Sequence, residues 1–102
     1  MEEDVVAIKV IVEFQAKPGR RAELKSLLES VEAKYGRGQP GFLGSTRYEV
    51  LDNPNMLIEI SDWASAEVRA EAMPKVMATG AYAPLEDLLA APFRAAVIRQ
   101  MA

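Results

Sequence analysis

The chain has 102 residues, of which half are apolar and 26% are charged, and its formal net charge is −3 at pH 7. We expect a single domain, 1–102, because about 100 residues supply the apolar side chains of one core. The basic residues are dispersed, which excludes the polycationic surface of proteins that bind nucleic acid or anionic membranes.

The chain contains neither cysteine nor histidine. A zinc site, a thiolate nucleophile, an imidazole base and a histidine-ligated haem therefore cannot be built from its side chains. No calcium-loop spacing occurs either, so we assign no metal and no cofactor. The first four residues are acidic where a signal peptide is basic, and no apolar stretch is long enough to span a bilayer. We therefore expect a cytoplasmic protein.

The first predicted strand is 5–14, a segment rich in β-branched residues. One parity of the strand is apolar and comprises Val6, Ile8, Val10, Val12 and Phe14. The other parity is partly apolar as well, through Val5, Ala7 and Ile11. Both faces of this strand should therefore be covered. A turn at 17–19 follows, and an amphipathic helix is predicted over 20–35.

Alternating residues predict a second strand over 42–51 and a third over 56–63. The intervening segment 52–55 is dense in turn formers, so the two strands should form an antiparallel hairpin.

A second helix should begin after Ser65, which can act as its N-cap. Its inward residues are predicted to be Val68, Ala72, Val76 and Met77. A further helical pattern covers 81–91, and a final strand is predicted over 93–101.

This order of elements is that of an α+β, ferredoxin-like βαββαβ fold with an antiparallel sheet covered by helices on one face. The opposite face would be open to solvent. Apolar residues on both parities of the first and third strands predict that the same face of a second copy covers it. We therefore expect a homodimer that forms a dimeric α/β barrel.

Trp63 and Glu59 are the first candidate site residues. Both share strand parity with Leu57, so they should project from the same face. Trp63 either anchors the core or lines a pocket for a planar ligand. Glu59 is either a partly buried base or the partner of Arg47 or Arg99 in an ion pair.

Further candidate site residues are four polar side chains and three large apolar ones. The hydroxyl and cationic side chains of Tyr48, Tyr82, Arg47 and Arg99 can orient a substrate oxygen, but each is also compatible with a packing or surface role. Three apolar residues either line a ligand pocket or fill it: Met73, Met77 and Leu85.

Several short segments occur in the order typical of one family. They are Lys17-Pro18-Gly19, Pro40-Gly41-Phe42-Leu43-Gly44, Tyr48 followed by Asp52-Asn53-Pro54, and Asp62-Trp63-Ala64-Ser65. Across nearly its whole length the chain resembles the antibiotic biosynthesis monooxygenase family. The resemblance implies small dimeric α/β barrels and a cofactor-independent monooxygenase that oxidises polycyclic phenols to quinones.

The resemblance also assigns roles to residues. Trp63 corresponds to the family's pocket tryptophan, and Glu59 replaces an asparagine that is frequent in quinone-forming members. The helix after Trp63 lacks the histidine that the haem-degrading branch uses as its iron ligand, which argues against haem degradation.

Three functions follow as hypotheses. The leading one is an oxygenase that acts on an aromatic or polyketide-like molecule, with Glu59 as base, Trp63 as stacking wall, and Tyr48 or Arg47 polarising the substrate oxygen. The others are a non-catalytic dimer that binds a small apolar molecule, and a non-oxidative cyclase or isomerase that uses the same cavity.

Overall fold

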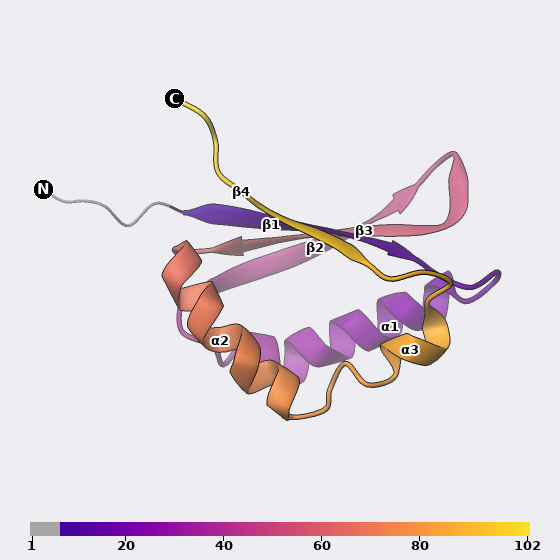
Figure 1. Ribbon diagram of the computed structural model, residues 1–102, viewed down its shortest axis with the longest axis horizontal. Helices are drawn as coiled ribbons and strands as arrows, with labels where there is room; N and C mark the ends of the chain where they lie inside the picture. The colour runs from indigo at the N-terminus through magenta and orange to yellow at the C-terminus, as the bar shows by residue number, and fades with distance from the viewer. Residues whose placement is uncertain (1–6) are drawn as a thin grey trace, which may run out of the picture.

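The computed structural model describes residues 7–102. Its elements follow the predicted order, with a π-helical turn after the first helix and a short extra helix before the last strand (Figure 1). Their bounds are β1 (Ile8–Gln15), α1 (Arg21–Val31), η1 (Glu32–Gly36), β2 (Phe42–Val50), β3 (Asn53–Trp63), α2 (Ala66–Ala78), α3 (Leu85–Leu88) and β4 (Arg94–Ile98).

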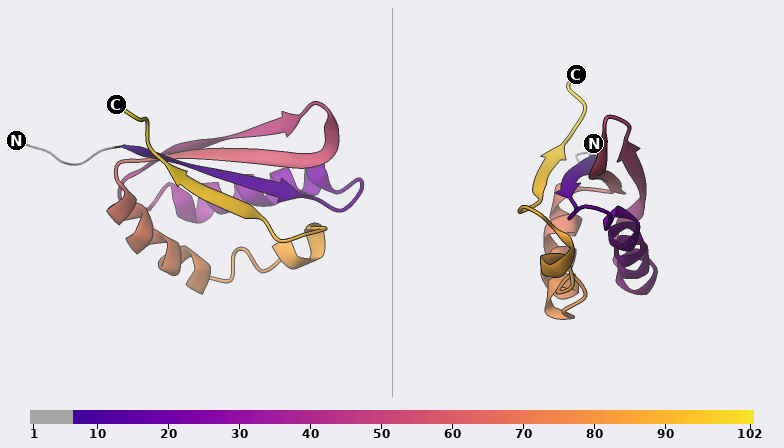
Figure 2. Two further views of the ribbon diagram at one scale, coloured as in Figure 1. Left: turned by 45° about the horizontal axis from the view of Figure 1, so that its top comes forward. Right: turned by 90° about the vertical axis from the view of Figure 1, so that its right-hand side faces the viewer.

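The four strands form one antiparallel sheet in the order β2-β3-β1-β4. The helices α1, α2 and α3 all lie on one side of this sheet (Figures 1 and 2). No element of residues 7–102 covers the other side. The predicted α+β, ferredoxin-like arrangement is therefore confirmed.

Two clusters of buried side chains join the sheet to the helices. The larger one connects β1 and β3 to α1 and α3 through Phe14, Ala16, Leu24, Leu28, Leu57, Leu85 and Leu88. The smaller one connects β1 and β3 to α2 through Ile8, Val10, Trp63 and Ala72. Val12 packs against both clusters. The helical layer is thus held to the sheet at two places, with room for a cavity between them.

The hairpin between β2 and β3 is tighter than predicted. Its turn covers 51–52 instead of 52–55, and β3 already begins at Asn53. The side chain of Asn53 accepts a hydrogen bond from the backbone N–H of Asn55 (3.1 Å), which is the local turn chemistry of asparagine. Pro54 has no N–H to donate, and it lies in a part of β3 that no ladder pair uses.

Other boundaries differ at the ends of elements. The predicted first strand included Val5 and Val6, which lie outside the described residues. The first helix changes to a π-helical turn at Glu32. The pattern over 81–91 forms one helical turn only, because the backbone is extended at Leu89 (φ −96°, ψ 137°). The last strand ends at Ile98.

The sheet face opposite the helices carries a row of uncharged residues across all four strands, which is apolar on β3, β1 and β4 and ends at Thr46 on β2. Thr46 pairs with Ile60, Ile60 with Ile11, and Ile11 with Ala96. Both isoleucines are only partly buried in the single chain. Contiguous exposed apolar area of this kind is typical of an interaction surface.

Gly41 sets the close approach of β2 to α2. Its φ of +82° lies in the left-handed region, and a Cβ atom at this position would stand 2.5 Å from Cγ2 of Val68. Its carbonyl accepts a hydrogen bond from the N–H of Ala64 at the end of β3 (2.8 Å). Glycine is therefore required here both by backbone conformation and by packing.

We predict that Gly41→Ala lowers the free energy of unfolding by about 2–4 kcal/mol, the sum of left-handed strain and an overpacked contact. Urea denaturation followed by circular dichroism measures this value. Gly19→Ala is the matched control, because Gly19 has a φ of +78° but no atom within 4 Å of the added Cβ. The control should lose only about 1 kcal/mol. Equal losses in the two variants would contradict the proposed packing contribution.

Candidate functional site

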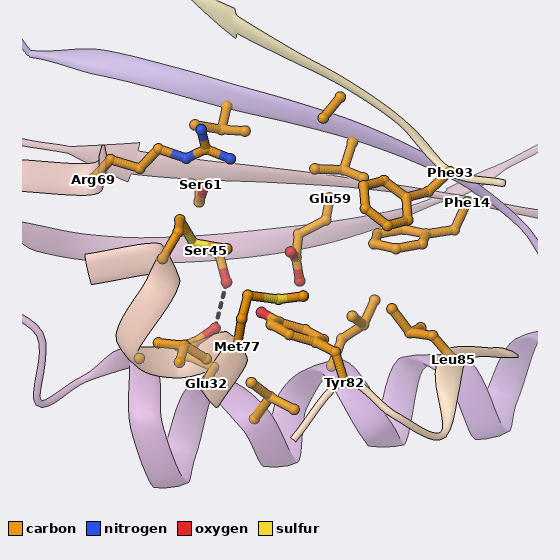
Figure 3. Close-up of a pocket in the computed structure, with 18 of the residues that line it drawn as sticks. Phe14, Glu32, Ser45, Glu59, Ser61, Arg69, Met77, Tyr82, Leu85 and Phe93 are labelled. Carbon is orange, nitrogen blue, oxygen red and sulfur yellow. Dashed lines mark hydrogen bonds between the residues drawn. The ribbon is translucent and has the colours of Figure 1, made fainter. Parts of the chain in front are cut away.

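A cavity of about 860 Å³ lies between the sheet and the helices (Figure 3). This volume is within the range of about 300–1,000 Å³ that is usual for small-molecule sites. Most of its lining side chains are apolar. The polar ones labelled in Figure 3 are Glu32, Ser45, Glu59, Ser61, Arg69 and Tyr82. An apolar cavity with a few polar groups fits a largely apolar ligand that is oriented at specific atoms.

Glu59 projects from the middle of β3 into this cavity (Figure 3). It lies on the same sheet face as Leu57 and Trp63, as strand parity predicted, and its side chain is 16% exposed. Burial raises the pKa of Glu59 above its usual range, and a hydrogen bond from Arg47 opposes the shift without cancelling it. The ionised carboxylate is therefore a stronger base than that of an exposed glutamate.

Arg47 holds Glu59 from the neighbouring strand β2. Its Nη1 atom lies 3.1 Å from Oε2 of Glu59, 3.1 Å from Oε1 of Glu32 and 2.8 Å from Oγ of Ser45. The ion pair that the sequence offered as the alternative to a base role is thus present, with Arg47 as the partner of Glu59 among the described residues and not Arg99. Nη1 carries only two hydrogen atoms, so these three acceptors share two protons.

Glu32 competes with Glu59 for the charge of Arg47. Burial favours the neutral form of Glu32, but hydrogen bonds from Ser45 and Arg47 together outweigh burial and lower the pKa of Glu32. The two carboxyl groups consequently shift in opposite directions. Of the two, Glu32 is the stronger acid and Glu59 is the stronger base.

Tyr82 adds a hydroxyl group to this part of the cavity. Its side chain points toward the Glu59 carboxyl group (Figure 3). Burial raises the pKa of Tyr82, and the negative charge of Glu59 raises it further. Tyr82 therefore remains a neutral phenol and can donate a hydrogen bond to an oxygen atom in the cavity.

Trp63 both packs in the core and lines the cavity, and its stacking on a planar ligand stays a prediction. The residue is 5% exposed and belongs to the smaller core cluster. Its Nε1 donates a hydrogen bond to Oγ of Ser61 (3.2 Å), and Phe42 packs against its ring edge-on with centroids 5.1 Å apart. These contacts fix the plane of the indole.

The remaining sequence candidates divide into two groups. Met73, Met77 and Leu85 line the cavity. Met77 points inward, as predicted, toward Glu59 and Tyr82 (Figure 3), and it remains 56% exposed because it follows the buried Val76 by one residue and so turns by about 100° around the helix.

Tyr48 does not lie at this cavity, which corrects its assignment beside Glu59. It follows Arg47 directly in β2, so its side chain projects from the opposite sheet face. It pairs with Ile58 there and is 49% exposed. Arg47 itself does not line the cavity, but it donates a hydrogen bond to the carboxylate of Glu59.

Sequence reasoning missed three charged residues of the cavity, Arg69, Glu32 and Glu86, of which the first two carried a signal. Arg69 lies three and seven residues before the buried Ala72 and Val76 of α2. Glu32 follows the buried Leu28 by four residues. A charged residue at the spacing of an inward helical face was therefore the available signal.

Two further features are absent from residues 7–102. No three acidic, histidine or cysteine side chains in this range converge at a spacing that can hold a metal ion. None of its helices is long and apolar enough to cross a membrane.

Solved structures with the same fold come from several organisms. SnoaB, a cofactor-independent oxygenase from Streptomyces nogalater, is 20% identical with a TM-score of 0.80, and the match covers 95% of each chain. A conserved protein from Methanosarcina mazei Go1 is 20% identical with a TM-score of 0.82, again over 95% of each chain. Rv0793 from Mycobacterium tuberculosis is 22% identical with a TM-score of 0.77, over 94% of this chain and 96% of that one. At these identities the likeness establishes the fold alone.

No curated protein sequence matches the chain. The sequence profile of the antibiotic biosynthesis monooxygenase family, however, matches residues 7–75, which is more than half of the chain. This range runs from β1 into α2 and contains Glu59, Trp63 and Arg69. The resemblance noted from short segments is therefore confirmed, and the chain belongs to the antibiotic biosynthesis monooxygenase family.

Proposed function

We propose that this protein is a cofactor-independent monooxygenase that converts an aromatic or polyketide-like phenol into a quinone. The observation that carries the proposal is the raised pKa of Glu59 inside a largely apolar cavity. A base in such a place can take a proton from a bound carbon acid or phenol while water is largely kept away. Membership in the monooxygenase family and the likeness to SnoaB support the same reaction class.

The chemistry needs only the substrate and molecular oxygen as reactants. Glu59 removes a proton from an activated CH₂ group of the ring system, and the resulting carbanion transfers one electron to oxygen. The substrate radical and superoxide combine to a peroxide anion, and the protonated Glu59 returns its proton to give the hydroperoxide. Loss of water then leaves a carbonyl group, so one oxygen atom enters the product and the other leaves as water. The tasks of the protein are deprotonation and orientation.

The surrounding residues have supporting roles in this proposal. Trp63 offers a fixed aromatic plane against which a polycyclic ring can stack. Tyr82 donates a hydrogen bond to the developing enolate oxygen and so takes the role first considered for Tyr48. Arg47 is a positioning residue, because it acts on Glu59 without lining the cavity.

A second candidate function is a binding protein without turnover. The hydrogen bond from Arg47 to Glu59 favours it, because a paired carboxylate is a weaker base than a free one. Competition from Glu32 weakens this pairing, which is why we prefer the enzyme. A cyclase or isomerase would differ from an oxygenase by leaving the mass of its substrate unchanged.

We further infer that the protein acts as a homodimer through the open face of its sheet. The apolar row around Ile60 and Ile11 is self-complementary, and a second copy can cover it across a two-fold axis. On this open face β4 presents Ala96 and Ile98, both exposed in the single chain (Ile98 38%). A chain of this size also gains burial that it cannot reach alone.

Glu59→Gln should reduce oxygen consumption with anthrones and naphthols by about a hundredfold or more, since the base is lost while the side-chain shape is kept. An oxygen electrode measures this rate, and mass spectrometry of the product checks that one oxygen atom is added. Glu71→Gln, an exposed change on α2, is the control and should leave the rate unchanged. Undiminished turnover in Glu59→Gln would remove the base assignment. If the unaltered protein binds these compounds without consuming oxygen, the binding protein is the correct alternative.

Glu32→Gln tests how the pKa of Glu59 is set. The substitution removes a negative charge beside Glu59 and frees Arg47 to hydrogen-bond to it, so the pKa of Glu59 should fall. A base works when deprotonated, and kcat/KM rises with pH through its pKa. The rising limb of the pH profile should therefore move to lower pH in Glu32→Gln. Glu23→Gln, which removes the same charge from α1 away from Arg47, should not move it. A limb that stays in place would show that Glu59 is not the titrating group.

Ile60→Lys should convert the dimer into a monomer, because it places a charge in the middle of the apolar row. Light scattering coupled to size-exclusion chromatography should give twice the 11.2 kDa chain mass for the unaltered protein and one chain mass for the variant. Leu51→Lys changes another exposed apolar residue, at the hairpin turn, and should remain dimeric. A monomeric unaltered protein would refute this assembly.

A further inference from the structure

Arg69 is the only cation of the described residues that lines the cavity. It lies in the first turns of α2, is partly buried, and extends into the cavity (Figure 3). Within residues 7–102 its guanidinium group forms neither an ion pair nor a side-chain hydrogen bond. Four other arginines, by contrast, each pair with a glutamate: Arg20, Arg21, Arg37 and Arg47.

Ser61 supplies a second donor on the cavity wall. Its oxygen accepts the hydrogen bond from Nε1 of Trp63 (3.2 Å), and its own proton is donated to no atom of the described residues. Three carboxylates line the cavity, and none of them uses Arg69: Glu59 and Glu32 both bind Arg47, and Glu86 forms no ion pair with Arg69 within residues 7–102. The donors of Arg69 and Ser61 are thus free for a ligand.

We propose that Arg69 and Ser61 form a subsite for a carboxylate group of the ligand. A guanidinium group is a planar fork whose N–H bonds match the two oxygens of a carboxylate. The largely apolar walls lower the local dielectric constant and strengthen this attraction relative to water. The ligand is accordingly an aromatic acid rather than a neutral polycycle. This inference rests on the proposed function in one respect, namely that the same cavity holds the substrate.

The subsite also gives the substrate a direction. A carboxylate bound at Arg69 fixes one end of the molecule, and the ring system then lies beside Trp63. The acidic position of the ring is left to face Glu59. Arg69 on α2 would therefore discriminate between charged and neutral analogues, whereas Glu59 on β3 would transfer the proton.

The test measures binding of quinones that cannot turn over, so it does not depend on oxygenase activity. The probes are anthraquinone carboxylate and the isosteric anthraquinone carboxamide. Trp63 is the only tryptophan of the chain, and quenching of its fluorescence reports occupancy of the cavity. We expect the unaltered protein to bind the carboxylate at least about tenfold more tightly than the carboxamide, as one charge-assisted hydrogen-bond pair provides.

Arg69→Gln should abolish this preference with little change in carboxamide affinity. Lys75→Gln removes the same charge from an exposed position of the same helix and should keep the preference. Equal binding of the two probes to the unaltered protein, quenching by neither probe, or an equal loss in both variants would overturn the subsite. If Arg69→Gln does not fold, the affinities of the two probes for the unaltered protein still decide whether the carboxylate subsite exists. Failure of the oxygenase proposal would appear separately, as absent oxygen consumption with intact carboxylate binding.

Discussion

The guanidinium group of Arg47 connects the parts of the molecule on which the site depends. Through one nitrogen it reaches Glu59 on β3, Ser45 on its own strand β2, and Glu32 at the start of η1. The side chains of Arg47, Glu32 and Glu59 are only 12%, 13% and 16% exposed, so the arrangement is little screened by water. Among the described residues Glu59 pairs with Arg47 alone, whereas Glu32 also pairs with Arg37 (3.6 Å) and accepts a hydrogen bond from Ser45, and this asymmetry separates their pKa values.

The position of this network explains how a small chain keeps a large cavity. Two apolar clusters hold the helical layer to the sheet at separate places, and polar groups occupy part of the space between them. These groups are hydrogen-bonded to one another, so they do not carry the full cost of burial. The chain thus retains both a packed core and space for a ligand.

Charge is distributed unevenly around the cavity. Arg47 serves Glu59 and Glu32, whereas Arg69 has no partner among the described residues. In the proposed function the paired group tunes the base, and in the proposed subsite the unpaired group binds an anion. Base and anion subsite lie on different elements, β3 and α2, so a change in α2 can alter ligand preference without moving the base.

Local pattern determined much of this protein. Strand parity placed Glu59 and Trp63 on one face, because side chains alternate along any strand. The order of elements determined the sheet topology, and the missing histidine and cysteine limited the chemistry. Tertiary structure decided the rest. The register of β2 against β3 pairs Arg47 with Glu59 and so places Tyr48 beside Ile58 on the opposite face, while Glu32 and Arg69 reach the cavity from two different helical segments. Periodicity describes one element at a time, and which charges share a cavity depends on distances between elements that only folding sets.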